Sequence, residues 1–186
     1  MIIEGVDTCG KSTQIELLKQ RYPQAVFTKE PGGTSLGVEI RSLVLDRDIK
    51  SKTAELFLFL ADRAEHFAQI VIPNLDKLII SDRGFVSGIS YALSFEFDIL
   101  KSLNKMALEN HLPDKIIFLK LSKEELTKRL STKSHDKIES RGVEYLMNIQ
   151  QRIEMVISEL GLNALILNAS DEIIDINNKI INFLEE

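Results

Sequence analysis

Residues 5 to 13, GVDTCGKST, contain a phosphate-binding pattern, because Gly5, Gly10, Lys11 and Ser12 satisfy the spacing G-x-x-x-x-G-K-[ST]. The two glycines let the backbone turn so that successive N–H groups point at phosphate oxygens. A helix that begins near Lys11 adds the positive end of its dipole. We therefore predict that Lys11 reaches the β- and γ-phosphates of a nucleotide and that Ser12 ligates Mg²⁺. A switch, a motor and a kinase can all begin with such a loop.

A second group of polar residues follows the apolar run LIIS at residues 78 to 81. Asp82 at the end of this predicted strand can hold Mg²⁺ directly or through water, and Arg83 can bind a phosphate bidentately. An isolated Asp-Arg pair is typical of a surface ion pair, but its position at a strand end favours the functional interpretation. The segment EPGGT at residues 30 to 34 predicts a tight turn. This turn would place Glu30 at the mouth of the site, with Thr34 or Ser35 capping the next helix.

The segment ELFLFLADRAEHF, residues 55 to 67, has helical periodicity and places Phe59 and Arg63 four residues apart on one face. A ring beside a guanidinium can stack on a planar base and donate hydrogen bonds to its edge. Periodicity alone favours the simpler interpretation, a core phenylalanine next to a solvated arginine.

Short apolar runs alternate with longer amphipathic segments along the chain, which predicts a parallel sheet with helices on both faces. Ligands bind such sheets at the carboxyl ends of the strands, where the phosphate loop and Asp82-Arg83 fall. The predicted strands are 2–4, 25–27, 77–81, 115–121 and 164–168. The predicted helices begin at Lys11, Ser35, Lys52, Val86, Phe97, Lys123, Gly142 and Asp171, with Ser170 or Asp171 as the N-cap of the last helix.

The bulk composition is ordinary for a globular domain of 186 residues. A net charge of −5 gives no support to nucleic-acid binding through a basic face. One cysteine excludes an internal disulfide, and no signal peptide or apolar run of about 18 residues is visible. We therefore expect a cytoplasmic protein with no nucleic-acid or membrane partner.

Taken together, these segments resemble the thymidylate kinase family, whose members phosphorylate dTMP with ATP. The resemblance runs in order through GVDTCGKST, EPGGT, FLADRAEH, SDRGFVSGISYA and DKIE, and it covers nearly the whole chain. It implies a three-layer P-loop kinase fold over residues 1–186, with a five-stranded parallel sheet, helices on both faces and a small lid.

The resemblance also implies roles for individual residues. Phe59 would stack on thymine, Arg63 would bind the base on its O4 edge, and Tyr91 would lie against the 2′-carbon and select deoxyribose. Arg83, Asp7 and Lys11 would be the catalytic residues. The implied ATP site is Gly5, Val6, Asp7, Thr8, Cys9, Gly10, Lys11, Ser12, Thr13 and Arg129. The implied dTMP site is Asp7, Glu30, Phe59, Arg63, Arg83, Ser87 and Tyr91, and the implied metal site is Ser12, Asp82 and Glu30.

The predicted lid spans about residues 129–144, a polar and basic segment between two helices. The phosphate loop lacks a basic residue at positions 6 to 9, whereas Lys133, Lys137 and Arg141 populate the lid beside Arg129. This distribution resembles the lid-arginine arrangement of many bacterial members. The chain departs from the family at Gly84, where an aromatic residue is common, and at Gly88, where some members carry an amide side chain.

The resulting expectation is in-line transfer of the γ-phosphoryl group from Mg·ATP to dTMP, giving dTDP and ADP. Kinases for another nucleoside monophosphate or for a deoxynucleoside remain alternatives, as does a P-loop switch that hydrolyses nucleotide without an acceptor. The family resemblance further implies a homodimer, for which Phe57, Phe67 or the segment around Phe95 could supply an apolar face.

Overall fold

Five parallel strands form the centre of the computed structural model, which describes residues 1–131 and 141–186. The strand order is β2-β3-β1-β4-β5, so the first strand of the chain lies in the middle of the sheet. The strands are β1 (Ile2–Glu4), β2 (Val26–Lys29), β3 (Ile79–Asp82), β4 (Ile116–Lys120) and β5 (Ala164–Asn168). This arrangement confirms the predicted five-stranded parallel sheet.

Helices follow the strands in alternation, as the sequence predicts. The described α-helices are α1 (Lys11–Arg21), α2 (Ser35–Asp46), α3 (Lys52–His66), α4 (Phe85–Tyr91), α5 (Phe97–Ala107), α6 (Lys123–Ser131), α7 (Val143–Glu159) and α8 (Ile173–Glu185). A π-helical turn (Phe67–Val71) and a 3₁₀ turn (Ile72–Asn74) extend α3. Each α-helix begins within two residues of its predicted start.

The predicted N-cap of the last helix is wrong. Glu172, rather than Ser170 or Asp171, occupies the N-cap position of α8, and its side chain makes no capping hydrogen bond. The preceding residues belong to a turn held by Asn168, whose Oδ1 accepts from the Ser170 backbone N–H and whose Nδ2 donates to Asp171 Oδ1. This local turn competes with helix formation, because an asparagine side chain can bond to nearby backbone groups.

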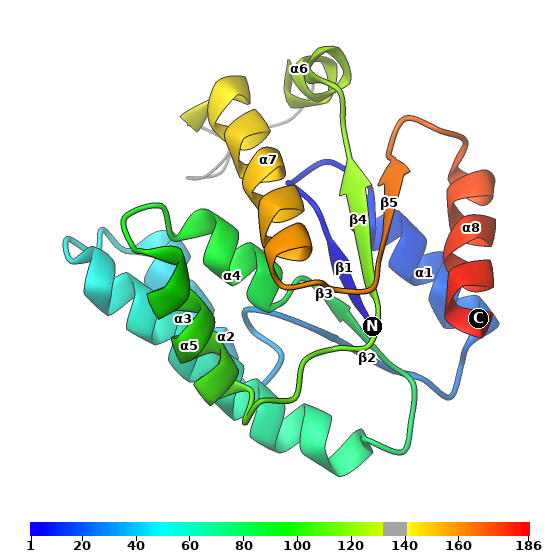
Figure 1. The fold of residues 1–186 in the computed structure, drawn as a ribbon. Coiled ribbons are helices and arrows are strands. Elements are labelled where there is room, and N and C mark those ends of the chain that lie inside the picture. The colour runs from blue at the N-terminus through cyan, green and yellow to red at the C-terminus, as the bar shows by residue number, and fades with distance from the viewer. Residues whose placement is uncertain (132–140) are drawn as a thin grey trace.

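Helices cover both faces of the sheet (Figure 1). α1 and α8 lie side by side on one face, and α4 and α7 lie together on the other. α2 packs on α3, and α5 contacts both α3 and α4, so these three helices extend the second layer. The three inner strands, β3, β1 and β4, have neighbours on both sides and helices above and below. These strands are therefore mainly apolar on both faces.

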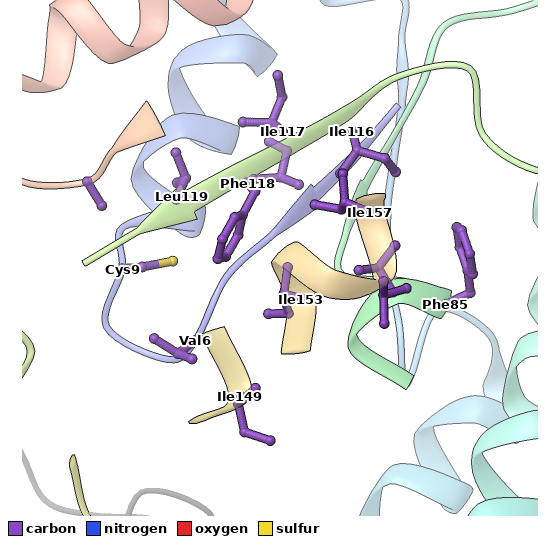
Figure 2. Close-up of a cluster of buried hydrophobic side chains, with 14 of the residues drawn as sticks. Val6, Cys9, Phe85, Ile116, Ile117, Phe118, Leu119, Ile149, Ile153 and Ile157 are labelled. Atoms are coloured by element: carbon purple, nitrogen blue, oxygen red, sulfur yellow. The ribbon is translucent and has the colours of Figure 1, made fainter. Parts of the chain in front are cut away.

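Part of the core lies where β4 passes between the two helical layers (Figure 2). Phe118 points toward Ile149 and Ile153 of α7, whereas Ile117 and Leu119 point to the opposite face. All of these side chains are buried. Alternating directions along β4 follow from the two-residue period of a strand, which lets a single strand contribute to both layers.

Some expectations about the surface are corrected by the packing. Phe67 is buried at the end of α3 and belongs to the core, so it cannot supply an exposed apolar face. Phe57 is 56% exposed, and Phe95 is only partly buried. Within residues 1–131 and 141–186, no helix combines the length and apolar character needed to cross a membrane.

The strand register places the predicted functional segments at one edge of the sheet. Ile3 of β1 aligns with Asp82 of β3, and Lys29 of β2 aligns with the same aspartate. The phosphate loop after β1, the Glu30 loop after β2 and Arg83 after β3 therefore leave the sheet side by side. Parallel strands bring their carboxyl ends together in this way.

Candidate active site

The phosphate loop leaves β1 at Gly5 and enters α1 at Gly10. Gly5 approaches other atoms so closely that a Cβ there would lie 2.7 Å from the Leu119 carbonyl oxygen, and Gly10 has a left-handed φ of 98°. Lys11 begins α1, and its Nζ donates to the carbonyl oxygens of Gly5 and Val6 at 3.1 Å each. The ammonium group is thus held over the loop, where phosphate oxygens would lie.

Arg83 ties the end of β3 to the phosphate loop. Its Nη1 donates to the Gly5 carbonyl oxygen at 2.6 Å, and its Nη2 forms an ion pair with Asp7. Its φ of 68° is unusual for a residue with a side chain, and such backbone strain is typical of functional sites. The structure therefore brings together Asp7, Lys11 and Arg83, the three predicted catalytic residues.

A cavity of about 340 Å³ opens between these elements. Its lining contains several lysine and arginine side chains facing a smaller set of carboxylates, as expected for a site that holds several phosphates and a cation. The lining residues are Asp7, Thr8, Lys11, Ser12, Lys29, Glu30, Arg41, Asp82 and Arg83. Arg41 on α2 is absent from the predicted site, because an arginine on an amphipathic helix is indistinguishable from a solvated one.

The Glu30 loop is clamped onto α3 by polar contacts. Glu30 Oε2 accepts from Arg63 Nε at 2.8 Å, and Glu30 Oε1 lies 2.9 Å from His66 Nδ1. Asp62, the residue before Arg63 on α3, accepts from the Gly32 backbone N–H at 2.9 Å. Burial alone would raise the pKa of Glu30, but the adjacent charge of Arg63 and the hydrogen bond from His66 hold that pKa below its usual value. Glu30 is therefore ionised, and each of its carboxylate oxygens has a partner on α3.

Arg63 is buried, with 4% of its surface exposed, so the interpretation of it as a solvated arginine is wrong. In addition to Glu30, its Nη1 donates to Asn104 Oδ1 on α5 at 2.5 Å. Phe59, one turn earlier on α3, is partly exposed, as a ring available to a ligand would be. Sequence periodicity could not detect these partners, because they come from two other elements.

Two residues of α4, Ser87 and Tyr91, also contact Arg83. The Arg83 guanidinium lies over the Tyr91 ring, 5.7 Å from its centroid, and Arg83 Nη1 donates to Ser87 Oγ at 3.3 Å. The Tyr91 hydroxyl is buried without a hydrogen-bond partner in the described part of the chain. Burial raises the pKa of Tyr91 well above its ordinary value, so the phenol stays neutral.

Glu4, which is absent from the predicted site, contacts Ser87. It is fully buried at the end of β1, and it accepts hydrogen bonds from the backbone N–H of Ser87, at 3.1 Å, and from the Ser87 hydroxyl. Burial raises the pKa of Glu4 to about 7, although the Ser87 bonds and the charge of Arg83 act in the other direction. A charged residue inside an apolar strand is the signal that could have identified it.

Arg129 on α6 connects the phosphate loop to the turn after β5. Its Nη1 donates to the Thr8 carbonyl oxygen at 3.0 Å and its Nη2 to the Ala169 carbonyl oxygen at 2.9 Å. Of the other predicted lid cations, Arg141 donates to the Tyr145 hydroxyl at 2.9 Å. Lys133 and Lys137 lie outside the described residues.

The magnesium site predicted from the sequence can be compared with the carboxylates of the cavity. Asp82 Oδ1 is buried with no hydrogen-bond donor among residues 1–131 and 141–186, and such an orphaned oxygen suits a hard cation. Ser12 lines the same cavity, whereas both oxygens of Glu30 are engaged by α3. Within the described chain, no three His, Cys, Asp or Glu side chains gather into a metal cage. Asp82 and Ser12 therefore fit a cation that nucleotide phosphates help to hold.

The fold and the site define a P-loop kinase: a phosphate loop follows the central strand, and an Asp-Arg pair ends the neighbouring strand. The family model described as thymidylate kinase matches residues 3–180. The chain belongs to the thymidylate kinase family.

Individual relatives agree with this assignment over more than nine-tenths of their lengths. The chain is 55% identical over 179 residues to the thymidylate kinase of Wolinella succinogenes, covering 96% of this chain and 94% of that protein. It is 52% identical over 182 residues to the thymidylate kinase of Aliarcobacter butzleri, covering 98% and 96%. The crystal structure of thymidylate kinase from Ehrlichia chaffeensis shares the fold, with a TM-score of 0.78 at 24% identity over 100% of this chain and 97% of that one.

Proposed function

We propose that this protein transfers the γ-phosphoryl group of Mg·ATP to dTMP, giving dTDP and ADP. The observation that carries this proposal is that the phosphate loop, Asp82, Arg83 and the Glu30 loop line one shared cavity. Membership of the thymidylate kinase family over residues 3–180 supports dTMP as the acceptor. One acceptor site beside one donor site is what a kinase requires.

On the donor side, the backbone N–H groups of residues 5 to 13 bind the ATP phosphates, and Lys11 binds the β- and γ-phosphates. Arg129 lies against Thr8 and Ala169 and closes the ATP site on the side of β5. Ser12 and Asp82 hold Mg²⁺, with Glu30 contributing through water. When bound, Mg²⁺ would offset the negative charge that develops on the phosphate oxygens.

On the acceptor side, Arg83 binds the dTMP phosphate, and Asp7 orients Arg83 through their ion pair. Phe59 stacks on the thymine ring, and Arg63 donates to the O4 edge, where cytosine has an amino group instead of an acceptor. Tyr91 and Ser87 lie against the sugar. Tyr91 selects deoxyribose, because a ribose 2′-hydroxyl would clash with its ring.

The acceptor phosphate is already anionic at neutral pH, so the transfer needs no strong general base. Rate enhancement comes from holding donor and acceptor in line and from offsetting the crowded negative charge. Lys11 and Arg83 provide fixed positive charge on the two sides of the reaction. Residues 129–144 act as a lid whose cations, Lys133, Lys137 and Arg141 with Arg129, exclude water and complete the charge balance.

The whole chain acts as one kinase domain in a cytoplasmic homodimer. The neighbouring helices α2 and α3 expose apolar side chains, Leu36, Val38 and Phe57, which suit contact with a second copy. Such exposed apolar surface is typical of protein interfaces.

Release of ADP from Mg·ATP, measured with a panel of acceptors, tests the function. We expect strong stimulation by dTMP, weak stimulation by dUMP, and none by dCMP, AMP, UMP or thymidine. Stimulation by thymidine would indicate a nucleoside kinase, and stimulation by another monophosphate would reassign the base site. ADP release that is the same with and without acceptor would support a P-loop switch and overturn the proposal.

A further inference from the structure

Arg63 is anchored from two directions by groups that belong to different elements. Its Nε donates to Glu30 in the loop after β2, and its Nη1 donates to Asn104 in α5. Arg63 and Asn104 are respectively 4% and 1% exposed, so water does not compete for these bonds. A guanidinium is planar and has donors on fixed edges, so two such anchors determine the orientation of its plane.

Asn104 is itself held rigidly. Its Nδ2 donates to the Leu100 carbonyl oxygen one turn earlier in α5, at 2.7 Å. With Nδ2 committed to the helix, Oδ1 is the atom that faces the guanidinium, which is a pure donor. The amide therefore presents a fixed acceptor to Arg63, and its orientation does not depend on a bound ligand.

Gly88 on α4 lies against the guanidinium and contributes no side chain there. A Cβ at this position would lie 2.7 Å from Arg63 Nη1 and 2.9 Å from Nη2, closer than nonbonded atoms approach. The guanidinium thus occupies the space that a larger residue at position 88 would need. An amide at position 88 is incompatible with Arg63 as the structure places it, whereas the amide of Asn104 bonds to it from α5.

We propose that Asn104 is a positioning residue of the acceptor site, which fixes the Arg63 guanidinium and thereby sets the affinity for the dTMP base. The proposal rests on the proposed function, in which Arg63 contacts thymine. Without Asn104, Nη1 loses its buried acceptor, and the guanidinium turns to find another or remains unsatisfied. Either outcome weakens base binding, whereas the phosphate loop is held by other contacts, from Lys11, Arg83 and Arg129.

Steady-state kinetics with dTMP and ATP varied separately test this role. We expect Asn104→Ala to raise the KM for dTMP by roughly tenfold, equivalent to about 1.4 kcal/mol, and to leave the KM for ATP unchanged. Asn104→Asp retains an oxygen acceptor for Arg63 but loses the Nδ2 donor to Leu100, so it should recover only part of the lost affinity. Asn177→Ala is the matched control, because Asn177 is also a buried helical asparagine, hydrogen-bonded to Gln14 away from Arg63. It should leave the KM for dTMP unchanged.

A double-mutant cycle with Arg63→Lys separates positioning from general destabilisation. If Asn104 acts through Arg63, then adding Asn104→Ala to Arg63→Lys should raise the KM for dTMP far less than it does in the wild type. Additive effects would overturn the proposal, as would equal increases in both KM values or an equal effect of Asn177→Ala. If Asn104→Ala does not fold, as judged by circular dichroism, Asn104→Ser takes its place in the cycle. A wild-type enzyme that dTMP does not stimulate would instead refute the proposed function.

Discussion

At the scale of single residues, Arg83 has the largest expected effect on transfer. It contacts the phosphate loop at Gly5 and Asp7 and stacks on Tyr91. We expect Arg83→Ala to lower kcat/KM by roughly 10³-fold, since loss of a preorganised charge at a transferring phosphoryl group costs several kcal/mol. The kcat/KM of Arg83→Lys should lie between those of the wild type and of Arg83→Ala, because lysine keeps the charge and loses the bidentate fork.

Coupled ADP-release assays give these rates, and circular dichroism verifies the fold of each variant. Arg21→Ala is the control, because Arg21 forms an exposed ion pair with Glu185 far from the cavity lining. Near-normal activity of Arg83→Ala would contradict the assignment of the acceptor phosphate to this arginine.

Glu4 makes stability depend on pH. Burial raises its pKa from 4.5 to about 7 in the folded protein, so the folded state binds this proton more tightly than the unfolded state. The sign follows from linkage: the stabilisation is complete below about pH 4.5 and is lost as pH rises through about 7. Above that pH the folded protein carries a buried carboxylate at a free-energy cost of a few kcal/mol.

We expect Glu4→Gln to unfold at higher urea concentration than wild type at pH 8, and the difference to shrink steadily toward pH 5. Glutamine retains an acceptor for the Ser87 N–H and does not titrate. Urea titrations at several pH values measure the difference between the two proteins, which cancels the other titrating groups. A constant difference across this range would show that Glu4 keeps an ordinary pKa.

At the scale of elements, helix caps decide how the Glu30 loop joins α2. Thr34 caps α2 by accepting from the Gly37 N–H, and Ser51 caps α3 by accepting from the Ala54 N–H in the same geometry. Thr34 is buried, whereas Ser51 is exposed. We expect Ser51→Ala to cost about 1 kcal/mol of unfolding free energy and Thr34→Ala about 2, since water cannot replace the buried cap.

The two caps also differ in their expected effect on catalysis. Thr34 follows the loop that carries Glu30, so Thr34→Ala should raise the KM for dTMP, and Ser51→Ala should not. Urea unfolding and acceptor kinetics on the same preparations provide both readouts. Equal stability losses, or a KM effect in Ser51→Ala, would refute a link between this cap and the acceptor site.

At the scale of the whole molecule, Phe57 is the test of the proposed homodimer. It is 56% exposed on α3, where a ring of that size leaves a large apolar area in water. We expect Phe57→Glu to convert the dimer to a monomer in sedimentation velocity, because a charge inside an apolar interface is strongly unfavourable. Met106→Glu on α5 is the control, since Met106 is exposed to a similar degree. A monomeric wild-type protein would contradict the proposal.

Local sequence patterns determined the phosphate loop, the five strands and the starts of the helices. The spacing of Gly5, Gly10 and Lys11 predicted a loop between β1 and α1, and the five apolar runs predicted the five strands of the sheet. The helix starts were also predictable, because caps, periodicity and turn residues act over only a few positions. Even the convergence of Lys29, Asp82 and Gly5 follows from parallel strands ending at one edge.

The partners of the buried polar groups were decided by the tertiary structure alone. Arg63 reads as an ordinary surface arginine until α5 brings Asn104 to it and the Glu30 loop closes from the other side. Glu4 is a charge in an apolar strand until α4 supplies Ser87. Hydrophobic periodicity encodes which face of an element is buried, and it carries no information about which distant donor meets which acceptor. That pairing depends on how the helices pack, and packing exists only in the folded chain.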